Sequence, residues 1–257
     1  MALETRMDYT CRLVWLDQSY DKRRGQDKIL SMKRMLLWVL SIILVLVTIG
    51  FLLKRDLQQK RTVDGIDISH HNVVRDWDKV KVGFIYAKAT EGRSHRDRKY
   101  KSYRQNATKR DIPFGAYHFL STDVSATQQF QNFKKAVPKG STTLIPMLDI
   151  EGKLPIPDDS LKALVGGWIN ECYNYYGYYP VLYLSPYSIY IRLIGTPNLS
   201  KCQLWSGITP PRWEIIPFYT ARIVQFKIDK VNGFVGGVDC NHLNGTIDDL
   251  KMKTIKM

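Results

Sequence analysis

The sequence predicts a modified α/β barrel that follows one membrane-spanning helix. A long run without charged residues lies near the N-terminus, and the rest of the chain alternates apolar strand-like segments with polar helix-like segments. Such alternation favours a parallel sheet covered by helices. We count about eight strands and fewer helices, which indicates a barrel in which some strands lack a helix.

The uncharged run spans Met35–Leu53, and its 19 residues would form a helix about 28 Å long, close to one hydrocarbon core. Lys33 and Arg34 precede it, and Lys54 and Arg55 follow it. No small-x-small cleavage pattern ends the run, which favours a retained signal anchor over a removed signal peptide and over a buried core helix. Basic residues are more numerous before it, so we expect a single-pass protein with its N-terminus in the cytoplasm and its catalytic domain on the periplasmic or extracytoplasmic side.

Three further segments follow from composition. Residues 1–34 form an N-terminal extension that is either cytoplasmic or non-native, because its first thirty residues are polar and aperiodic and are expected to be disordered or not translated. Residues 54–63 form a polar linker. Residues 64–257 are enough for one domain with a sizeable core.

The domain at 64–257 is basic, with 26 Lys and Arg residues against 18 Asp and Glu residues. A basic surface favours a polyanionic partner. The sequence contains no RNA-binding motif of interleaved basic and aromatic residues and no helix-turn-helix pattern, so we expect no nucleic-acid partner. Behind an export anchor, an anionic cell-wall polymer fits better.

The cysteines show no metal-binding spacing. Cys11 precedes the apolar run, and Cys172, Cys202 and Cys240 are scattered through the domain. We interpret these three as small buried residues, although one pair could form a disulfide in an oxidising compartment.

The elements of the domain follow from residue type and spacing. Runs rich in β-branched and aromatic residues predict strands at Gly65–Ser69, Phe84–Ala89, Phe114–Phe119, Leu144–Asp149, Val181–Ser185, Gln203–Ser206, Arg222–Phe226 and Gly237–Asp239. Helices are predicted over Asp97–Arg110, from a cap at Asp123 through Val137, and from Asp158 to Tyr176 with Gly177 as the C-terminal cap.

Two carboxylates lie two residues apart on the fourth predicted strand. Side chains alternate along a strand, so Asp149 and Glu151 point to the same face. Adjacent carboxylates push one of the pair to keep its proton while the other stays ionised. A protonated acid beside an ionised carboxylate is the arrangement that hydrolyses glycosidic bonds.

Other polar residues gather where the predicted strands end. In α/β barrels the reacting groups lie at the C-terminal ends of the strands. The polar residues at these ends are Asp67, Ser69, Lys88, Glu91, Tyr117, His118, Asp149, Glu151, Ser185, Trp205, Gln225, Asp239 and Asn241. This repeated placement makes a catalytic interpretation of the two carboxylates stronger than that of a loop cap.

Seven short motifs in this order resemble glycoside hydrolase family 25, the Chalaropsis-type lysozymes. They are Gly65-Ile-Asp-Ile-Ser69, Lys88-Ala-Thr-Glu-Gly92, Gly115-Ala-Tyr-His-Phe119, Asp149-Ile-Glu151, Leu204-Trp205, Gln225-Phe226 and Val238-Asp-Cys-Asn241. The likeness covers roughly residues 64–245. It implies a (β/α)5β3 barrel with no metal or organic cofactor. It also implies an N-acetylmuramidase that cleaves the β-1,4 bond between N-acetylmuramic acid and N-acetylglucosamine in peptidoglycan, in remodelling or turnover of the cell wall.

The resemblance also implies roles for the acidic residues. Glu151 would be the general acid, and Asp149 would tune it or stabilise charge at the anomeric centre. Asp67 and Asp239 would complete an acidic ring, because closing the barrel places the first and last strands side by side. Whether a carboxylate or the acetamido group of the substrate attacks the sugar stays open.

Four residues are expected to bind substrate, each with an alternative. Tyr117 and Trp205 would stack on sugar rings, although core packing is the commoner role of a barrel aromatic. Gln225 would hydrogen-bond an acetamide group. Glu91 is either a site residue or a structural carboxylate paired with Lys88.

The histidines are expected to be structural. His118 lies in a strand that appears buried by its composition, which favours a core histidine with satisfied hydrogen bonds. His70 and His71 are adjacent, so they would point apart on a strand, and no third ligand follows at a suitable spacing. We therefore predict no metal site.

Two other functions fit the same pattern. A membrane-tethered module could bind peptidoglycan without cleaving it, although a binder has no need to place four repelling carboxylates in one cleft. The enzyme could also hydrolyse another amino-sugar polymer, since pocket shape decides that specificity.

Overall fold

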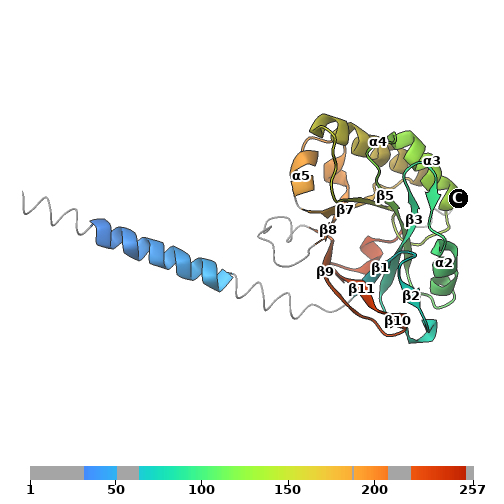
Figure 1. Cartoon of the computed structure of the whole chain (residues 1–257), viewed down its shortest axis with the longest axis horizontal. Helices are drawn as coiled ribbons and strands as arrows, with labels where there is room; N and C mark the ends of the chain where they lie inside the picture. The colour runs from blue at the N-terminus through green and yellow to red at the C-terminus, as the bar shows by residue number, and fades with distance from the viewer. Residues whose placement is uncertain (1–31, 51–63, 187, 208–220, 253–257) are drawn as a thin grey trace, which may run out of the picture. The chain divides into compact units, whose positions relative to one another are not determined.

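The computed structural model describes residues 32–50, 64–186, 188–207 and 221–252, which form an apolar helix and a separate folded domain (Figure 1). The helix Met32–Gly50 has 19 residues and a mean hydropathy of 2.1, so it is long and apolar enough to cross a membrane. It begins three residues before the predicted span. Residues 51–53 of that span, most of the N-terminal extension and the predicted linker lie outside the described residues.

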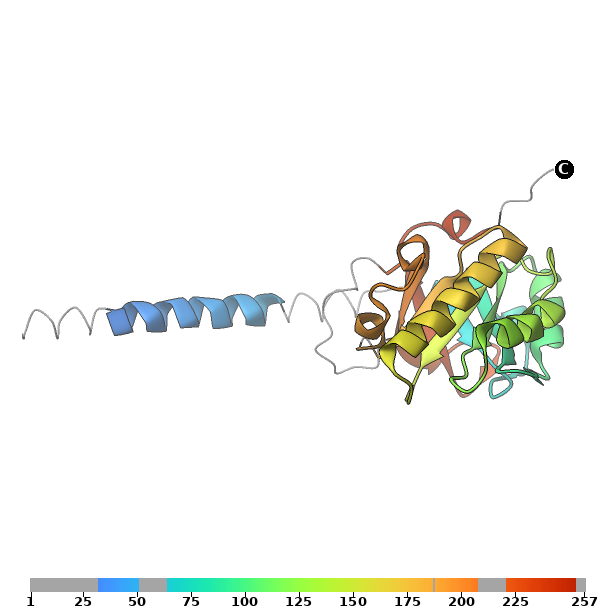
Figure 2. The same ribbon diagram turned by 90° about the horizontal axis from the view of Figure 1, so that it is seen from above.

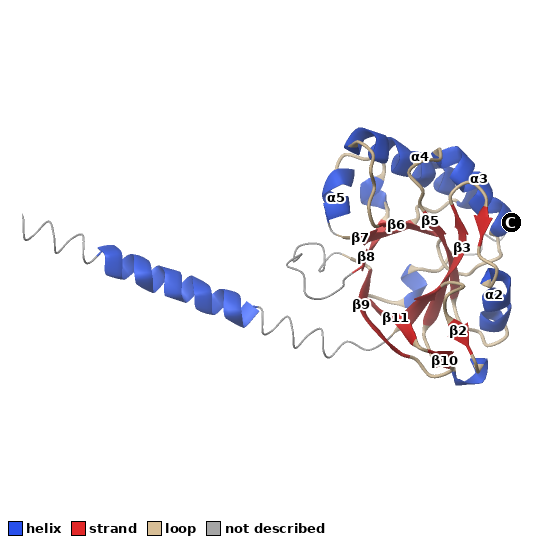
Figure 3. Ribbon diagram, viewed as in Figure 1, coloured by secondary structure: helices blue, strands red, loops and turns tan. Residues whose placement is uncertain are grey.

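The domain is built on a sheet of nine strands, eight of which close into a barrel (Figure 3). These eight are β1 (Gly65–Ile68), β3 (Phe84–Glu91), β5 (Phe114–Phe119), β6 (Met147–Glu151), β7 (Val181–Ser185), β8 (Gln203–Gly207), β9 (Ile223–Lys230) and β11 (Gly237–Leu243). The ring closes because β1 pairs with both β3 and β11. The short strand β4 (His95–Arg96) extends the sheet beside β3, and β2 (Val73–Val74) pairs with β10 (Phe234–Val235).

The strands from β1 to β9 run parallel in barrel order, as the sequence predicts. Strand β11 is the exception, because it runs antiparallel to both β9 and β1. The connection from Val231 to Gly236 holds only β10. So short a connection can form a hairpin but not a crossover to a parallel strand.

Helical segments occupy the first five connections between barrel strands. They are η1 (Trp77–Lys79), α2 (Tyr100–Thr108), α3 (Ala126–Ala136), α4 (Asp158–Tyr176) and the pair α5 (Ser188–Leu193) and η2 (Leu199–Lys201). A last single turn, η4 (Ile247–Asp249), follows β11. Helices α3 and α4 pack side by side on the outside of the barrel (Figure 2).

Helix α4 follows its sequence signals closely. It spans the predicted residues, and Asp158 and Asp159 occupy its first turn, where carboxylates complement the helix dipole. Gly177 adopts φ of 81° and donates its N–H to the Tyr173 carbonyl oxygen at 2.8 Å. This left-handed cap explains why glycine ends the helix.

The predicted first residues of two helices are wrong, because the aspartates expected there form hydrogen bonds with other groups. Helix α2 begins at Tyr100 rather than at Asp97, whose carboxylate accepts hydrogen bonds from the backbone N–H groups of His70 and Lys99. The cap of α3 is Ser125, whose hydroxyl accepts from the Gln128 N–H, and not Asp123, which accepts from the Ser121 hydroxyl.

Strand β6 is also shifted, since it begins at Met147 and continues to Glu151. Leu144 instead forms an isolated bridge with Lys251, and the Ile145 N–H donates to the Leu250 carbonyl oxygen. Pro146 then interrupts the ladder because it has no N–H to donate. The shift brings Glu151 within the strand.

The core has two layers. Between the helices and the strands, the fully buried Trp168 packs against Phe130 and Phe133. Inside the barrel, Trp205 packs against Tyr86 with ring centroids 5.2 Å apart. A Cβ on Gly115 would lie 2.3 Å from the Tyr86 ring, so only glycine permits this packing.

The cysteines of the domain are free thiols. Cys172 and Cys240 are buried, as predicted, while Cys202 is only partly buried. Cys11 lies outside the described residues.

Candidate active site

The structure brings the four predicted carboxylates together at the C-terminal end of the parallel strands. Asp67 of β1 pairs directly with Asp239 of β11, as expected from closure of the barrel. Asp149 and Glu151 project from β6, while Ile150 between them is fully buried on the other face. The negative charge of Glu151 raises the pKa of both Asp67 and Asp149, and the negative charge of Asp239 raises the pKa of Glu151. We call these four residues the acidic ring.

Asp149 is the most deeply buried member, with 7% of its surface exposed. Burial raises its pKa well above the usual value, and the negative charges of Glu151 and Asp67 raise the pKa further. Its Oδ1 atom has no hydrogen-bond partner among the residues that the structure describes. A buried oxygen without a partner disfavours the ionised form, so Asp149 holds a proton more readily than an exposed aspartate.

Glu151 combines a raised pKa with access to solvent. Burial raises the pKa of Glu151 and the charge of Asp239 raises it further, while the ammonium group of Lys88 opposes them. The residue is only partly buried. A carboxyl group that keeps its proton to higher pH and can be reached from outside is suited to general acid catalysis.

Asp67 and Asp239 are held by amide side chains. Asn241 donates to Asp67 Oδ2 at 2.8 Å, and Gln225 donates to Asp239 Oδ1 at 2.7 Å. Burial raises the pKa of both aspartates, and it raises that of Asp67 well above the usual value together with the negative charge of Asp239; these hydrogen bonds oppose the rise only in part. Each amide therefore favours an ionised partner within the acidic ring.

Trp205 lies behind the acidic ring and has no exposed face on which a sugar could stack. Its indole N–H donates to Asn241 Oδ1 at 3.2 Å, which leaves the Asn241 amide nitrogen directed at Asp67. The core-packing alternative for Trp205 therefore holds in this structure. Asn241, expected only as one strand-end polar residue, links Trp205 to the acidic ring.

Tyr117 and Tyr183 lie beside the carboxylates. Burial raises the pKa of both phenols, and the charges of Asp67, Asp149 and Glu151 raise it further. Tyr117 is 7% exposed and Tyr183 is 8% exposed. Tyr183 was not predicted, although its register opposite Asp149 on β7 follows from the alternation of the strand.

Lys88 and Glu91 form an ion pair with Nζ and Oε2 2.7 Å apart. This arrangement corresponds to the structural alternative for Glu91. The positive charge of Lys88 also lowers the pKa of Asp149 and of Glu151. Lys88 is thus a cation of the site, a role that the sequence did not assign to it beyond its place among the strand-end polar residues.

The histidines occupy structural positions. His118 is fully buried, with Nδ1 2.7 Å from the Thr90 hydroxyl and Nε2 3.0 Å from Gln129 Oε1, which confirms a satisfied core histidine. Burial lowers the pKa of His118 to about 4, so it is neutral at physiological pH. His70 Nδ1 lies 2.9 Å from Asp97 Oδ2. Within the described ranges, no group of three or more potential ligands could hold a metal ion.

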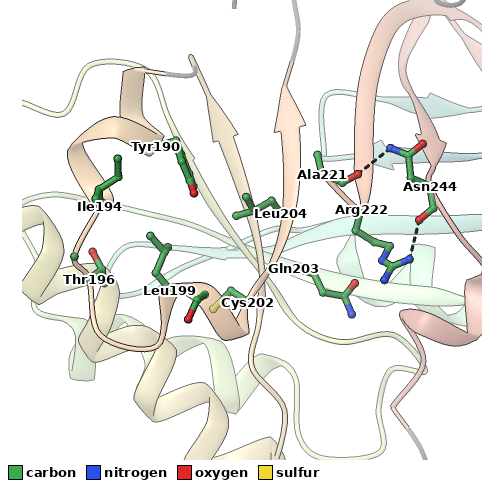
Figure 4. Close-up of a pocket in the computed structure, with 12 residues that line it drawn as sticks. Tyr190, Ile194, Thr196, Leu199, Cys202, Gln203, Leu204, Ala221, Arg222 and Asn244 are labelled. Carbon is green, nitrogen blue, oxygen red and sulfur yellow. Dashed lines mark hydrogen bonds between the residues drawn. The ribbon is translucent and has the colours of Figure 1, made fainter. Parts of the chain in front are cut away.

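A cavity of about 820 Å³ lies away from the acidic ring (Figure 4). Its lining includes Thr196, Gln203, Arg222 and Asn244, and Arg222 donates to the Asn244 carbonyl oxygen at 2.8 Å. Gln203 begins β8 and Asn244 follows β11, so the cavity lies at the N-terminal ends of the parallel strands. No member of the acidic ring lines it.

The comparison with protein families decides the assignment. A sequence model of the family described as "Glycosyl hydrolases family 25" matches residues 66–205. The chain belongs to this family. The matched region includes Asp67, Asp149 and Glu151, and the resemblance expected from the seven motifs is confirmed.

Individual relatives agree with this assignment. The chain is 36% identical over 207 residues to lysozyme M1 of Streptomyces globisporus, with 72% of this chain and 68% of the relative covered. It is 25% identical to a solved bacterial lysozyme from Streptomyces coelicolor, with a TM-score of 0.65 over 74% of this chain and 96% of that one. A family 25 glycosyl hydrolase from Bacillus anthracis shares the fold at 23% identity and a TM-score of 0.66, over 75% and 95% of the two chains.

Proposed function

We propose that this protein is an N-acetylmuramidase that cleaves the β-1,4 bond between N-acetylmuramic acid and N-acetylglucosamine in peptidoglycan. Its membership of a glycosidase family and the lysozymes among its relatives support this proposal. The observation that carries it is Glu151, a partly exposed carboxyl group with a raised pKa at the mouth of a barrel lined by three further carboxylates.

In the proposed reaction Glu151 donates its proton to the glycosidic oxygen. The bond from the anomeric carbon to that oxygen breaks, and its electron pair stays on the leaving oxygen. Ionised members of the acidic ring stabilise the positive charge that develops at the anomeric carbon. Water then completes the hydrolysis, and Glu151 recovers a proton from it.

The attacking group can come from the protein or from the substrate. A carboxylate of the acidic ring would form a covalent intermediate, whereas the acetamido oxygen of the substrate would form a cyclic one. Asp239 is the more suitable carboxylate, because burial raises the pKa of Asp67 and Asp149 well above the usual value, whereas the pKa of Asp239 is raised less and the Gln225 amide favours its ionised form.

The remaining predicted residues would bind the glycan around this centre. We propose that Tyr117 borders the subsite of the cleaved bond, since its phenol lies among the carboxylates. Gln225 would form a hydrogen bond with the substrate through the same amide group that donates to Asp239. Trp205 would act indirectly, by orienting Asn241. Glu91 would act at the edge of the site through its ion pair with Lys88.

The location of the enzyme follows from the apolar helix. We propose that residues 35–53 are retained as a single-pass anchor and that the catalytic domain lies outside the cytoplasm. The length and hydropathy of the helix support this proposal. A tethered enzyme acts on the wall of its own cell, so remodelling or turnover is the role that fits best.

The direct test is to digest purified peptidoglycan with the 257-residue chain in a neutral detergent. Products are reduced with borohydride, and the new reducing ends are identified by mass spectrometry. We expect reduced muramic acid ends from the wild type and none from Glu151→Gln. Glu171→Gln removes a carboxylate from the outer helix α4 and is the matched control, which should remain active.

Two other outcomes would redirect the assignment. Reduced glucosamine ends would keep a hydrolase but change the bond that it cleaves. Sedimentation of the protein with the insoluble wall, without new ends, would indicate a binding module.

A further inference from the structure

A strongly basic segment runs from Arg93 to Arg110. It carries eight Lys and Arg residues and one carboxylate, Asp97, while residues 64–257 together carry 26 against 18. Seven of the eight net positive charges of the domain therefore lie in this segment. Such a concentration on one segment of the surface indicates a docking surface for an anionic partner.

The one carboxylate does not neutralise these cations. Asp97 is 6% exposed, and its oxygens accept hydrogen bonds from the backbone N–H groups of His70 and Lys99. The exposed cations Arg96, Arg98 and Lys101 have no carboxylate within 4.0 Å in the part of the chain that the structure describes. We call these three residues the rim cations.

At the C-terminal end of the segment, one cation does have a carboxylate partner. Arg110 forms an ion pair with Asp78 at 2.7 Å, so its charge is already compensated. Of the seven cations of the segment that form no ion pair within the described residues, five lie at its beginning, around β4 and the first turn of α2, and two, Arg104 and Lys109, lie farther along.

The rim cations lie beside the mouth of the barrel. Strand β1 pairs with β3 only as far as Ala87, and β4 pairs with the last residues of β3, with Arg96 opposite Thr90. Strand β4 therefore continues the sheet beyond the end of β1, at the end of the barrel where Asp67 lies. The N–H of Asp97 donates to the Ala89 carbonyl oxygen at 2.9 Å, which holds this rim to β3.

We propose that the rim cations bind the free carboxylates of the stem peptides on the peptidoglycan strand that binds at the acidic ring. This inference rests on the proposed function. The sugar backbone of that polymer is uncharged, and its peptide substituents carry the carboxylates. A glycan strand of several sugars bound at the acidic ring would continue past the neighbouring rim, where its peptides would contact the exposed cations. Arginine suits this partner because its guanidinium group can bind a carboxylate through two parallel hydrogen bonds.

Binding to purified wall tests the inference directly. The 257-residue chain with Glu151→Gln, in neutral detergent, is sedimented with peptidoglycan and with the same insoluble wall after its free carboxylates have been converted to amides with a carbodiimide and methylamine. The rim variant adds Arg96→Gln, Arg98→Gln and Lys101→Gln. The control adds Lys81→Gln, Lys135→Gln and Lys139→Gln, which remove three exposed positive charges outside the segment.

We expect the rim variant to bind the untreated wall about 3- to 10-fold more weakly, as three exposed ion pairs would predict. Its affinity for the amidated wall should change less than about twofold, and the control should follow the parent on both. Raised salt should reduce the difference between the rim variant and the parent, because exposed charges are screened.

Several results would overturn the inference. Equal weakening on the untreated and the amidated wall, or no weakening on either, would exclude the stem-peptide carboxylates as the partner. The same holds if the rim variant binds wall normally but loses binding to vesicles of phosphatidylglycerol, which would identify a lipid partner instead. Sedimentation does not depend on turnover, so failure of the proposed muramidase activity would be recognised separately by the absence of new reducing ends.

Discussion

The acidic ring and the rim cations lie at the same end of the barrel but in different environments. The ring carboxylates are wholly or partly buried, and burial is the first cause of the raised pKa of all four. The rim cations are exposed and without compensating carboxylates in the described residues. Buried charges perturb each other's protonation and can transfer protons, whereas exposed charges keep their charge and attract an opposite one. The contrast teaches that burial determines whether a charged cluster is suited to chemistry or to docking.

The largest effect should come from removing the proton donor of the acidic ring. We expect Glu151→Gln to lower kcat by about 10²- to 10⁴-fold, because an amide cannot protonate the leaving oxygen. The measurement is the initial rate of reducing-end release from peptidoglycan. Binding to wall should persist, since the rim cations are unchanged. A variant that keeps more than a tenth of the activity would remove Glu151 from this role.

Asp149→Asn should separate activity from stability. We expect kcat to fall by about 10- to 100-fold, because an amide at this position cannot exchange a proton with the carboxylates beside it. The free energy of unfolding at neutral pH should rise by about 1–3 kcal/mol, since a buried oxygen without a partner no longer has to ionise.

The pH dependence of that stabilisation follows from the direction of the shift. The pKa of Asp149 is higher in the folded state than in the unfolded chain, so the folded state favours the protonated carboxyl group. The stabilisation that this residue gives to the fold is therefore fully present below the unfolded pKa and is lost as the pH rises through the folded pKa. The difference in the free energy of unfolding between Asp149→Asn and the wild type should therefore shrink as the pH is lowered. Melting temperatures of both proteins from acid to neutral pH test this, and a variant less stable at neutral pH would contradict it.

The pH profile should identify the charges that tune Glu151. Activity should fall as the pH rises through the raised pKa of Glu151, because the general acid then loses its proton. Asp239→Asn removes a negative charge that raises this pKa, so the alkaline limb of the profile should move to lower pH. Lys88→Met removes an opposing positive charge, so the limb should move to higher pH. If the alkaline limb of the kcat/KM profile moved in the same direction in both variants, these opposing effects of Asp239 and Lys88 on Glu151 would be refuted.

The smallest effect should come from the layer behind the acidic ring. Trp205→Phe keeps an aromatic ring but removes the N–H that Asn241 accepts, so we expect kcat to fall by about 3- to 10-fold and stability by about 1–2 kcal/mol. Trp168→Phe is the matched control, because its indole N–H is buried without a hydrogen-bond partner. Trp168→Phe should leave kcat unchanged, whereas an equal loss in both variants would show that only packing matters.

The sequence alone determined the features that depend on local spacing. The apolar run predicted the N-terminal helix, alternation predicted the strands, and the periodicity from Asp158 to Gly177 predicted α4 with its cap. Asp149 and Glu151 are two residues apart, so their common face followed from the alternation of side chains. The motifs that carry the family resemblance are equally local.

Only the tertiary structure decided which distant residues meet. Asn241 lies 174 residues from Asp67, yet its amide holds that carboxylate, and Trp205 orients the same amide from a third strand. Tyr183 joined the site through strand register rather than through a motif, and Lys88, although part of a motif, acts there through its charge on Asp149. Trp205, expected at a sugar subsite, is buried instead because the barrel interior closes around it. Local pattern depends on the geometry of one chain segment, whereas burial and long-range partners depend on the order in which the strands close the barrel.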